Sequence, residues 1–338
     1  MFMSLTSLSV VMPVFNGGET LPVCLAAIGR STMRPSELIV VDDCSTDESA
    51  TAAAAAGATV IRLEHQAGPA TARNIGAQRA TGEVVCFIDA DCEVQPETLE
   101  RIARRFSDHP DVAAIFGSYD DKPASSGFFA QYKNLAHRYV HQTSSEVATT
   151  FWAGCGAVRR EVFLGVGGFD GAKYPRPSIE DIELGYRLSQ AGHQILLAKE
   201  IVVTHHKAWS FRGMVRSDIY DRAIPWTMLL MSRGKEEKTL NLQWQHRFSA
   251  GLVLLLIIVL LTSLFEPLAL LPVLVAAAIL VWINRGFYVY LARLRGGLFT
   301  LKAIPVHWFT LSYSAVVYAI VSINYRLNRP RSAPAPRG

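Results

Sequence analysis

The chain has 338 residues, half of them hydrophobic, and a formal net charge of +4. This length allows one large domain or two smaller ones, and the hydrophobic fraction is high for a protein without a lipid-facing part. Because the basic residues gather beside the apolar C-terminal third, the charge favours an anionic membrane surface and argues against nucleic acid as a partner.

The five cysteines form no Cys-x-x-Cys pair and show no spacing typical of a metal site. Their odd number argues against a disulfide framework and favours a reducing compartment. The N-terminal run MFMSLTSLSVVMPVF has no basic start and no cleavage site of small residues. We interpret it as a first strand and not as a signal peptide.

Strand-like and helix-like segments alternate over the first 94 residues. Apolar runs that read as strands buried on both faces indicate a parallel α/β sheet. The expected elements are strands over 9–14, 37–41, 59–63 and 84–88 and helices over about 19–30, 49–56 and 69–79.

Two of these strands end in acidic residues, Asp42-Asp43 and Asp89-Ala90-Asp91. Ligands of open α/β sheets sit outside the carboxyl ends of the strands, so both acidic pairs should line one crevice. Residues i and i+2 at a strand end lie on the same side, which lets Asp89 and Asp91 face one ion. Mg²⁺ and Mn²⁺ prefer such oxygen ligands. Taken alone, an Asp-x-Asp sequence is more often a solvated acidic turn.

Other candidate residues in this half have two readings each. Asp42 could accept hydrogen bonds from a nucleobase or ribose, whereas Asp43 or Ser45 could simply cap the next helix. Arg73, followed by Asn74 within the helix that Gly68-Pro69 opens, could offset phosphate charge or lie on the helix surface.

The second part of the domain, from about 111 to 209, contains WAGCGAVRREVFLGVGGFD and then a helix expected over about 179–190. Ser178 is the expected N-cap and Gly192 the expected C-terminal stop. Glu180-Asp181 can complete that helix terminus, or Asp181 can act as a general base that takes a proton from a hydroxyl nucleophile. His205-His206 can supply a metal or phosphate ligand or can lie on the surface.

The C-terminal part is nearly continuous apolar sequence. Residues 248–265 and 267–283 carry almost no charge, are close to the minimum length for spanning a bilayer, and should form a tight hairpin. Residues 303–323 are either a third span or an interfacial helix, since basic residues precede and follow them. Residues 214–231 are expected to form an amphipathic surface helix.

Taken together, several motifs resemble those of the family 2 inverting glycosyltransferases, in the same order and at the same spacing. They cover about residues 8 to 210 and read PVFNGGETL, ELIVVDDCSTDES, GPATARNIGAQRATGEVVCFIDAD, GFD and IEDIELGYRL. The resemblance implies the GT-A fold, a Rossmann-like mixed α/β sheet, followed here by a helical membrane anchor. It also implies a nucleotide-sugar donor, UDP- or GDP-linked, with Mg²⁺ or Mn²⁺ as cofactor.

The same resemblance implies roles for individual residues. Asp181 corresponds to the catalytic base, with Glu180 beside it. Asp89 and Asp91 correspond to the metal-binding DxD motif, and His205 falls where some members have a histidine near the metal. Residues expected around the donor are Pro13, Phe15, Asp42, Arg73 and Asp89, with Asn74 and His206 as further neighbours of the site.

The chain departs from the processive polysaccharide synthases of that family, which carry a QxxRW motif after the ED pair. Here the region reads YDRAIPW. We therefore expect transfer of one sugar to a lipid-linked or saccharide acceptor on the cytoplasmic side of the inner (plasma) membrane, by a multi-pass protein. The expected parts are a catalytic domain over 1–212, a juxtamembrane segment over 213–247 and a membrane region over 248–338 with a basic tail. The alternatives are a polyprenyl-phosphate sugar synthase and an inactive membrane-bound scaffold that binds nucleotides.

Overall fold

The computed structural model describes residues 5–233, 244–262, 265–266 and 270–328. It divides into two compact units, the first ending at Met214 and the second starting at Val215. The expectations for the first four residues, for 234–243 of the juxtamembrane segment and for the basic tail after 328 lie outside the described residues, as do those for 263–264 and 267–269 of the two expected spans.

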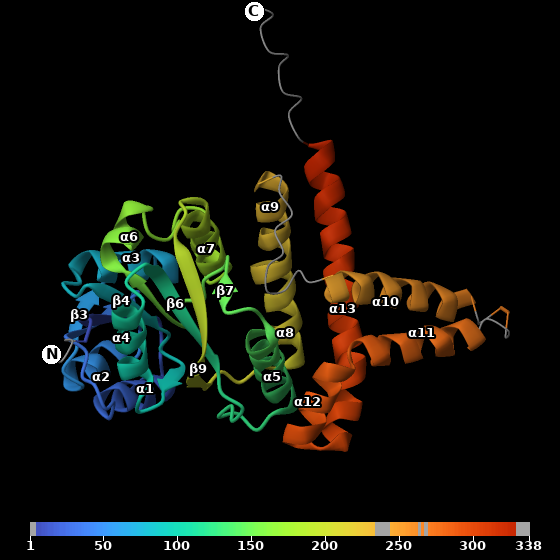
Figure 1. Ribbon diagram of the computed structural model, residues 1–338, viewed down its shortest axis with the longest axis horizontal. Coiled ribbons are helices and arrows are strands. Elements are labelled where there is room, and N and C mark those ends of the chain that lie inside the picture. The colour runs from blue at the N-terminus through green and yellow to red at the C-terminus, as the bar shows by residue number, and fades with distance from the viewer. Residues whose placement is uncertain (1–4, 234–243, 263–264, 267–269, 329–338) are drawn as a thin grey trace, which may run out of the picture. The chain divides into compact units, whose positions relative to one another are not determined.

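The first unit begins with the expected alternation of strands and helices (Figure 1). The three neighbouring pairs in the order β3-β2-β1-β4 are parallel, as predicted. These elements are β1 (Leu8–Val14), α1 (Thr20–Gly29), β2 (Glu37–Asp42), α2 (Ser49–Ala55), β3 (Thr59–Arg62), α3 (Pro69–Arg79) and β4 (Val84–Ile88).

The second half of the unit makes the sheet mixed. Its elements are β5 (Cys92–Val94), α4 (Thr98–Asp108), β6 (Val112–Tyr119), α5 (Phe128–Thr143), β7 (Val147–Ala148), β8 (Cys155–Arg159), α6 (Arg160–Gly165), α7 (Glu180–Gln190) and β9 (Gln194–His205). The sheet order continues from β4 as β8-β6-β9-β5, with β7 paired to β9. The antiparallel pairings of β8 and β5 make the whole sheet mixed, and the mixed α/β fold class is confirmed.

This topology brings distant strand ends to one edge of the sheet. Strand β8 is antiparallel to both β4 and β6, so β4 and β6 run in the same direction, and β9 is parallel to β6. The carboxyl ends of β1, β2, β4, β6 and β9 therefore share an edge, which places Asp42, Asp89 and His205 there. Helix α7 precedes β9 and runs back along the sheet, so its first turn reaches the same edge.

The end of α7 shows why that helix stops where the sequence predicts. Gly192 has φ of +84°, a left-handed conformation that costs glycine little. Its N–H donates to Ser189 O, and the N–H of His193 donates to Leu188 O, the bonding pattern of a Schellman motif. The expected stop at Gly192 is confirmed.

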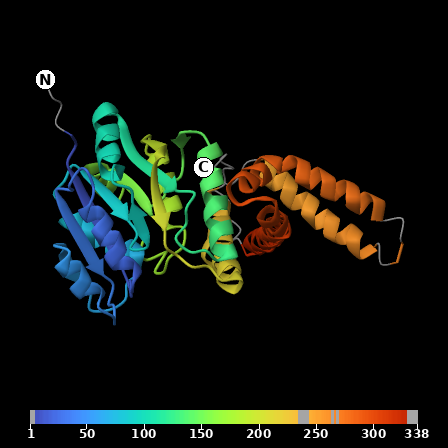
Figure 2. The ribbon, with the colours of Figure 1, turned by 90° about the horizontal axis from the view of Figure 1, so that it is seen from below.

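A helical run of three segments leads from the first unit into the second: α8 (Phe211–Arg216), the π-helix η1 (Ser217–Ala223) and α9 (Ile224–Arg233). The second unit continues with α10 (Trp244–Thr262), α11 (Leu270–Ile283), α12 (Arg285–Arg295) and α13 (Gly297–Leu327). Helices α10 and α11 lie side by side, as the orange pair in Figure 2 shows. The Tyr313 hydroxyl of α13 donates to the Asp218 carboxylate of η1 at 2.6 Å.

Among the described residues, two helices are long and apolar enough to cross a membrane by themselves, α10 from Gln245 and α13. Helix α11 qualifies only together with α12, and the two are bent by 68°. Its 14 described residues reach about 21 Å, less than the ~30 Å of a bilayer core. Residues 303–323 thus lie within α13, one of these two helices. The described helices allow two membrane spans, or three if α11 and α12 together form one.

Close packing of α3 on β1 yields a stability prediction. A Cβ atom on Gly76 would lie 2.4 Å from Cγ1 of Val11, so a larger side chain must push the helix off the strand. We expect Gly76→Val to destabilise the first unit by about 2 kcal/mol and to lower its melting temperature by roughly 4 °C or more. Thermal unfolding of the full chain in detergent, followed by intrinsic fluorescence, measures this.

Gly165→Val provides the matched control, because a Cβ at Gly165, also in a helix, meets nothing within 4 Å. Equal melting temperatures for the two variants would contradict the packing argument.

Candidate functional site

The turn after β4 places two carboxylates at the shared edge of the sheet. The N–H of Asp89 donates to Gly154 O, and the N–H of Cys92 donates back to Asp89 O, which closes the turn around Asp91. One oxygen of Asp89, one of Asp91 and the Cys92 sulfur all lie within 4.8 Å of one another. The two carboxylate side chains remain 33% and 32% exposed. They can therefore face one ligand, as the i, i+2 spacing predicts.

Arg73 ties this turn to a second part of the site. Its side chain is 6% exposed and donates to Asp89 Oδ1 at 2.6 Å and to Glu180 Oε1 at 3.0 Å. Burial opposes the charge, but the carboxylates of Asp89 and Glu180 raise the pKa of Arg73. The alternative of a surface arginine on α3 is wrong, because the helix turns this residue into the sheet edge.

The first turn of α7 carries the Glu-Asp pair. Glu180 is buried against Arg73 and also accepts the N–H of Ser178 at 2.9 Å. Asp181 is half-buried, and its two oxygens accept the N–H groups of Ala153 at 3.2 Å and Ile182 at 2.8 Å. The N-cap position belongs to Ile179 and has no side-chain cap bond. Ser178 as N-cap is therefore wrong, and the expected start of the helix is one residue early.

His205 approaches Asp91 from the end of β9. Its Nε2 lies 3.5 Å from Asp91 Oδ2, and its ring stacks on Tyr119 with centroids 4.3 Å apart. Burial raises the pKa of Asp91, but the hydrogen bond and charge of His205 and the charge of Lys207 outweigh it, so the pKa is lowered. His206 instead pairs its Nε2 with Glu93 Oε2 at 2.9 Å. Of the two histidines, His205 is the one aimed at the acidic turn.

The expected donor residues lie at the neighbouring strand ends. Pro13 is buried near the end of β1, and Phe15, just after it, is 46% exposed. Asp42 is fully buried at the end of β2, and its Oδ1 accepts the N–H of Ser45 at 2.9 Å. Its buried Oδ2 accepts no hydrogen bond from the described residues and lies 3.5 Å from Arg62 Nε. An oxygen in this state can accept a hydrogen bond from a ligand.

Asp43 and Ser45 do not cap the following helix. Asp43 accepts the N–H groups of Ala67 and Gly68, at 2.7 Å and 2.9 Å, and Ser45 Oγ accepts the N–H of Asn16. The cap reading is therefore wrong for both residues. Asp43 holds the loop that opens α3, the helix that carries Arg73.

Two further residues at the site were not predicted from the sequence. Tyr119 ends β6, and the rule that ligands gather at carboxyl ends would have found it. Cys92 follows the acidic turn directly, but its thiol is buried, and burial together with Asp91 raises its pKa. A protonated thiol is a poor ligand for the hard cations that carboxylates favour.

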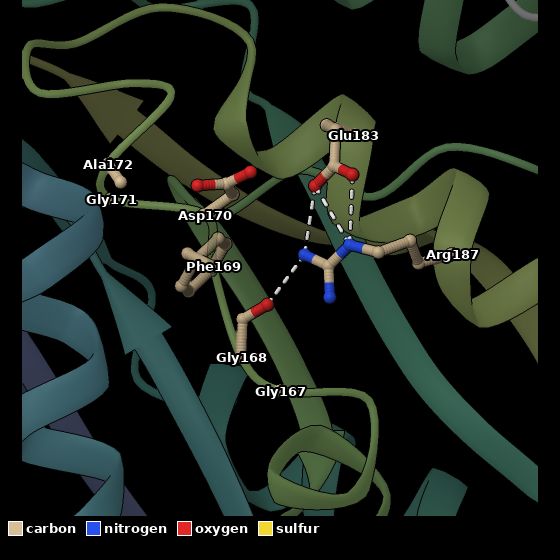
Figure 3. Close-up of a pocket in the computed structure, with 8 residues that line it drawn as sticks. All are labelled: Gly167, Gly168, Phe169, Asp170, Gly171, Ala172, Glu183 and Arg187. Atoms are coloured by element: carbon tan, nitrogen blue, oxygen red, sulfur yellow. Dashed lines mark hydrogen bonds and ion pairs between the residues drawn. The ribbon is translucent and has the colours of Figure 1, made fainter. Parts of the chain in front are cut away.

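A pocket of about 420 Å³ lies beside the second turn of α7 and is shown in Figure 3. Arg187 points into it but is already held by Glu183 and by the carbonyls of Val166 and Gly168. The neighbouring Asn74 bonds both ends of its amide to the Phe169 backbone. These bonds brace the Gly-Phe-Asp loop against α7 and α3, so Asn74 acts here as a support of the site.

The Arg73 ion pairs yield a second prediction. Arg73→Met keeps the volume but leaves Glu180 buried without its partner, which we expect to cost about 3 to 5 kcal/mol. Thermal unfolding of the full chain measures the loss, and the added substitution Glu180→Gln should recover part of it.

Arg104→Met is the control, since the Arg104–Glu100 pair lies on the surface of α4 with the arginine 64% exposed. Its effect should stay within about 0.5 kcal/mol. An equally small effect at Arg73 would show that its ion pairs do not stabilise the folded state.

The family described as "Glycosyl transferase family 2" matches residues 9–166. The "Uncharacterized glycosyltransferase YibD" of Escherichia coli (strain K12) is 40% identical over 120 residues, 33% of this chain and 34% of its own length. An "Undecaprenyl-phosphate 4-deoxy-4-formamido-L-arabinose transferase" of Pectobacterium atrosepticum is 36% identical over 115 residues, 31% of this chain and 35% of that protein.

Among solved structures, the mannosyltransferase PcManGT from Pyrobaculum calidifontis superposes with a TM-score of 0.58 at 18% identity. The alignment covers 95% of this chain and 88% of that one, and it shows a common fold. The matched segments span 34%, 62% and 43% of the lengths of three curated relatives. The motifs, the mixed sheet and these similarities agree, and the chain therefore carries a family 2 glycosyltransferase domain with the GT-A fold.

Proposed function

We propose that this chain is a membrane-anchored, inverting glycosyltransferase that moves one sugar from a nucleotide-sugar donor to a lipid-linked or saccharide acceptor. The observation that carries the proposal is the convergence of three groups at one sheet edge. These are the Asp89–Asp91 turn with His205, the buried Arg73–Glu180 pair, and Asp181 at the start of α7.

The nucleotide is proposed to bind over β1 and β2. Asp42 offers a buried carboxylate oxygen with no hydrogen-bond donor among the described residues, which suits an imide N–H or a ribose hydroxyl. Phe15 offers an exposed ring at the next strand end, against which a base can pack. The PcManGT structure contains GDP-Man and Mn²⁺, and a UDP- or GDP-linked donor is what we propose here.

The residues present fit a divalent cation. Asp91 and Asp89 contribute close carboxylate oxygens, and His205 adds a nitrogen near Asp91. Asp89 Oδ1 is taken by Arg73, so Asp91 and His205 are the proposed main ligands, with the second Asp89 oxygen available to the ion or the donor. A bound Mg²⁺ or Mn²⁺ would supply Lewis-acid stabilisation of the departing diphosphate.

The chain's own residues then account for the transfer. Asp181 accepts the proton of the acceptor hydroxyl, and the oxygen of that hydroxyl forms a bond to the anomeric carbon. The bond from that carbon to the donor phosphate breaks on the opposite face, and the nucleoside diphosphate leaves with the electron pair. Arg73 binds both Asp89 and Glu180, the residue next to Asp181. We therefore propose that Arg73 and Glu180 position the carboxylates around the reacting groups.

A second candidate, a polyprenyl-phosphate sugar synthase, is favoured by the similarity to the undecaprenyl-phosphate transferase. Its acceptor is already anionic, so Asp181 would matter less as a base. A candidate of another class is a scaffold that binds nucleotides without catalysis. Hydrolysis of a nucleotide-sugar by the purified chain separates that scaffold from both enzymes.

The membrane placement is also a proposal. Helices α10 and α13, and the bent pair α11–α12, are apolar enough to anchor the chain. The basic residues near Arg212–Arg247 favour the cytoplasmic face of the inner membrane. The YDRAIPW segment in place of QxxRW supports a single transfer and not processive synthesis.

The metal proposal predicts that EDTA abolishes sugar transfer and that Mn²⁺ or Mg²⁺ restores it. Asp91→Asn should weaken Mn²⁺ binding, measured by isothermal titration in the presence of the nucleoside diphosphate, and lower the transfer rate by about 10²-fold or more. Asp170→Asn, in the Gly-Phe-Asp loop, is the carboxylate control for metal binding. Transfer that persists undiminished in EDTA would rule out a metal-dependent mechanism.

The base proposal predicts that Asp181→Asn lowers the rate of transfer to a hydroxyl acceptor by about 10² to 10⁴-fold. Binding of the donor should stay unchanged, because the asparagine keeps the size and one oxygen. Near-normal transfer by this variant to a hydroxyl acceptor would exclude Asp181 as the general base. A loss of transfer that is confined to hydroxyl acceptors would support this role of Asp181 over the polyprenyl-phosphate alternative.

A further inference from the structure

The segment after β9 carries a cation and an aromatic ring that the proposed mechanism does not use. Lys207 is exposed, and its Nζ lies 4.6 Å from the ring centroid of Trp209. Lys133 of α5 also places its Nζ 5.2 Å from the centroid of that ring. Two ammonium groups thus lie close to the half-buried Trp209 ring.

This group adjoins the acidic turn. Lys207 follows His205 by two residues, and the N–H of His206, directly before it, donates to Asp91 O at 2.9 Å. Within the described part of the chain, Lys207 forms no ion pair. The lysine therefore keeps a free charge next to the proposed reaction centre, where an anionic group of a substrate can meet it.

The sheet separates this cation from the nucleotide end of the site. The order β3-β2-β1-β4-β8-β6-β9-β5 puts Asp42 of β2 on one side of β4 and Lys207, after β9, on the other. If the nucleotide occupies the β1–β2 end, the acceptor must approach from the opposite side in an in-line transfer. Lys207 lies on that acceptor side.

Apolar rings continue the surface. Phe211 is 41% exposed, and its ring lies 5.2 Å from that of Phe129 on α5. A cation beside such rings suits a ligand with a charged head and a hydrocarbon chain, since Trp and Phe pack against the chain while the ammonium meets the head.

We propose that Lys207 and Trp209 form an acceptor subsite that binds the phosphate group of a prenyl phosphate or a lipid-linked phosphate. This inference rests on the proposed function and names its acceptor class. Lys207 binds the phosphate oxygens through charge-assisted hydrogen bonds, Trp209 holds the lysine side chain in place, and Phe129 with Phe211 contacts the first part of the hydrocarbon chain.

The test measures binding of farnesyl phosphate, farnesol and inorganic phosphate to the full chain in detergent micelles by isothermal titration. We expect farnesyl phosphate to bind at least about 10-fold more tightly than either of the others, and Lys207→Gln to weaken it at least about 10-fold. Lys199→Gln, on the same strand β9, is the matched control and should bind as the wild type does. Trp209→Phe should remove the change in tryptophan fluorescence that accompanies binding.

Binding of nucleoside diphosphates to the same variant distinguishes this subsite from the donor site. UDP and GDP binding should stay within about 2-fold in Lys207→Gln, and an equal loss there would overturn the subsite by assigning Lys207 to the donor. Unchanged binding of farnesyl phosphate to the variant, equally tight binding of farnesol, or equally tight binding of inorganic phosphate would also overturn it. If the wild type binds no nucleotide and hydrolyses no donor while farnesyl phosphate still requires Lys207, the proposed function fails and the phosphate subsite stands.

Discussion

The buried ion pairs of Arg73 connect the parts of the site that the chain supplies from distant positions. Asp89 comes from the turn after β4, Glu180 from the first turn of α7 and Arg73 from α3. A buried arginine is costly without partners, and the buried carboxylate of Glu180 is costly without the arginine. The three groups therefore stabilise the folded state only as a set, and forming the set brings α3, α7 and the acidic turn into one arrangement.

Supports around this set follow the same logic. Asp43 accepts hydrogen bonds from the backbone at Ala67 and Gly68, just before α3 begins. Asn74, which follows Arg73 in α3, binds the backbone of Phe169. Arg187 joins α7 to the loop at Val166 and Gly168. Polar residues that resemble ligands in the sequence thus serve as supports of the fold. The side chains proposed to meet substrates are Asp91, Asp181 and Asp42, whose buried Oδ2 accepts no hydrogen bond from the described residues.

The charge of the site is divided along the sheet edge. Carboxylates gather over β2 and β4, where a metal ion and a nucleotide are proposed, while Lys207 and Lys133 lie beyond them around Trp209. His205 stands between the two regions, stacked on Tyr119 and aimed at Asp91. Such a division would let one edge of the sheet hold a bound cation and still attract an anionic acceptor.

The sequence by itself determined the alternation of strands and helices over the first 94 residues, the acidic strand ends, the stop of α7 at Gly192 and the apolar C-terminal helices. These features are local, because a continuous apolar run, a glycine after a helix or an acidic pair after a strand has the same meaning in any fold of that class. The resemblance of the ordered motifs to family 2 glycosyltransferases added the mixed GT-A sheet.

Only the tertiary structure decided which polar residues meet. Arg73 is buried between Asp89 and Glu180. Asp43 accepts hydrogen bonds from the Ala67–Gly68 backbone, and the ring of His205, not that of His206, faces Asp91. The tertiary structure also inserted β8 antiparallel between β4 and β6, and so brought the end of β9, with Lys207 and Trp209 after it, to the same edge. These contacts join residues 16 to 114 positions apart, and their partners depend on strand order and helix rotation, which no local pattern encodes.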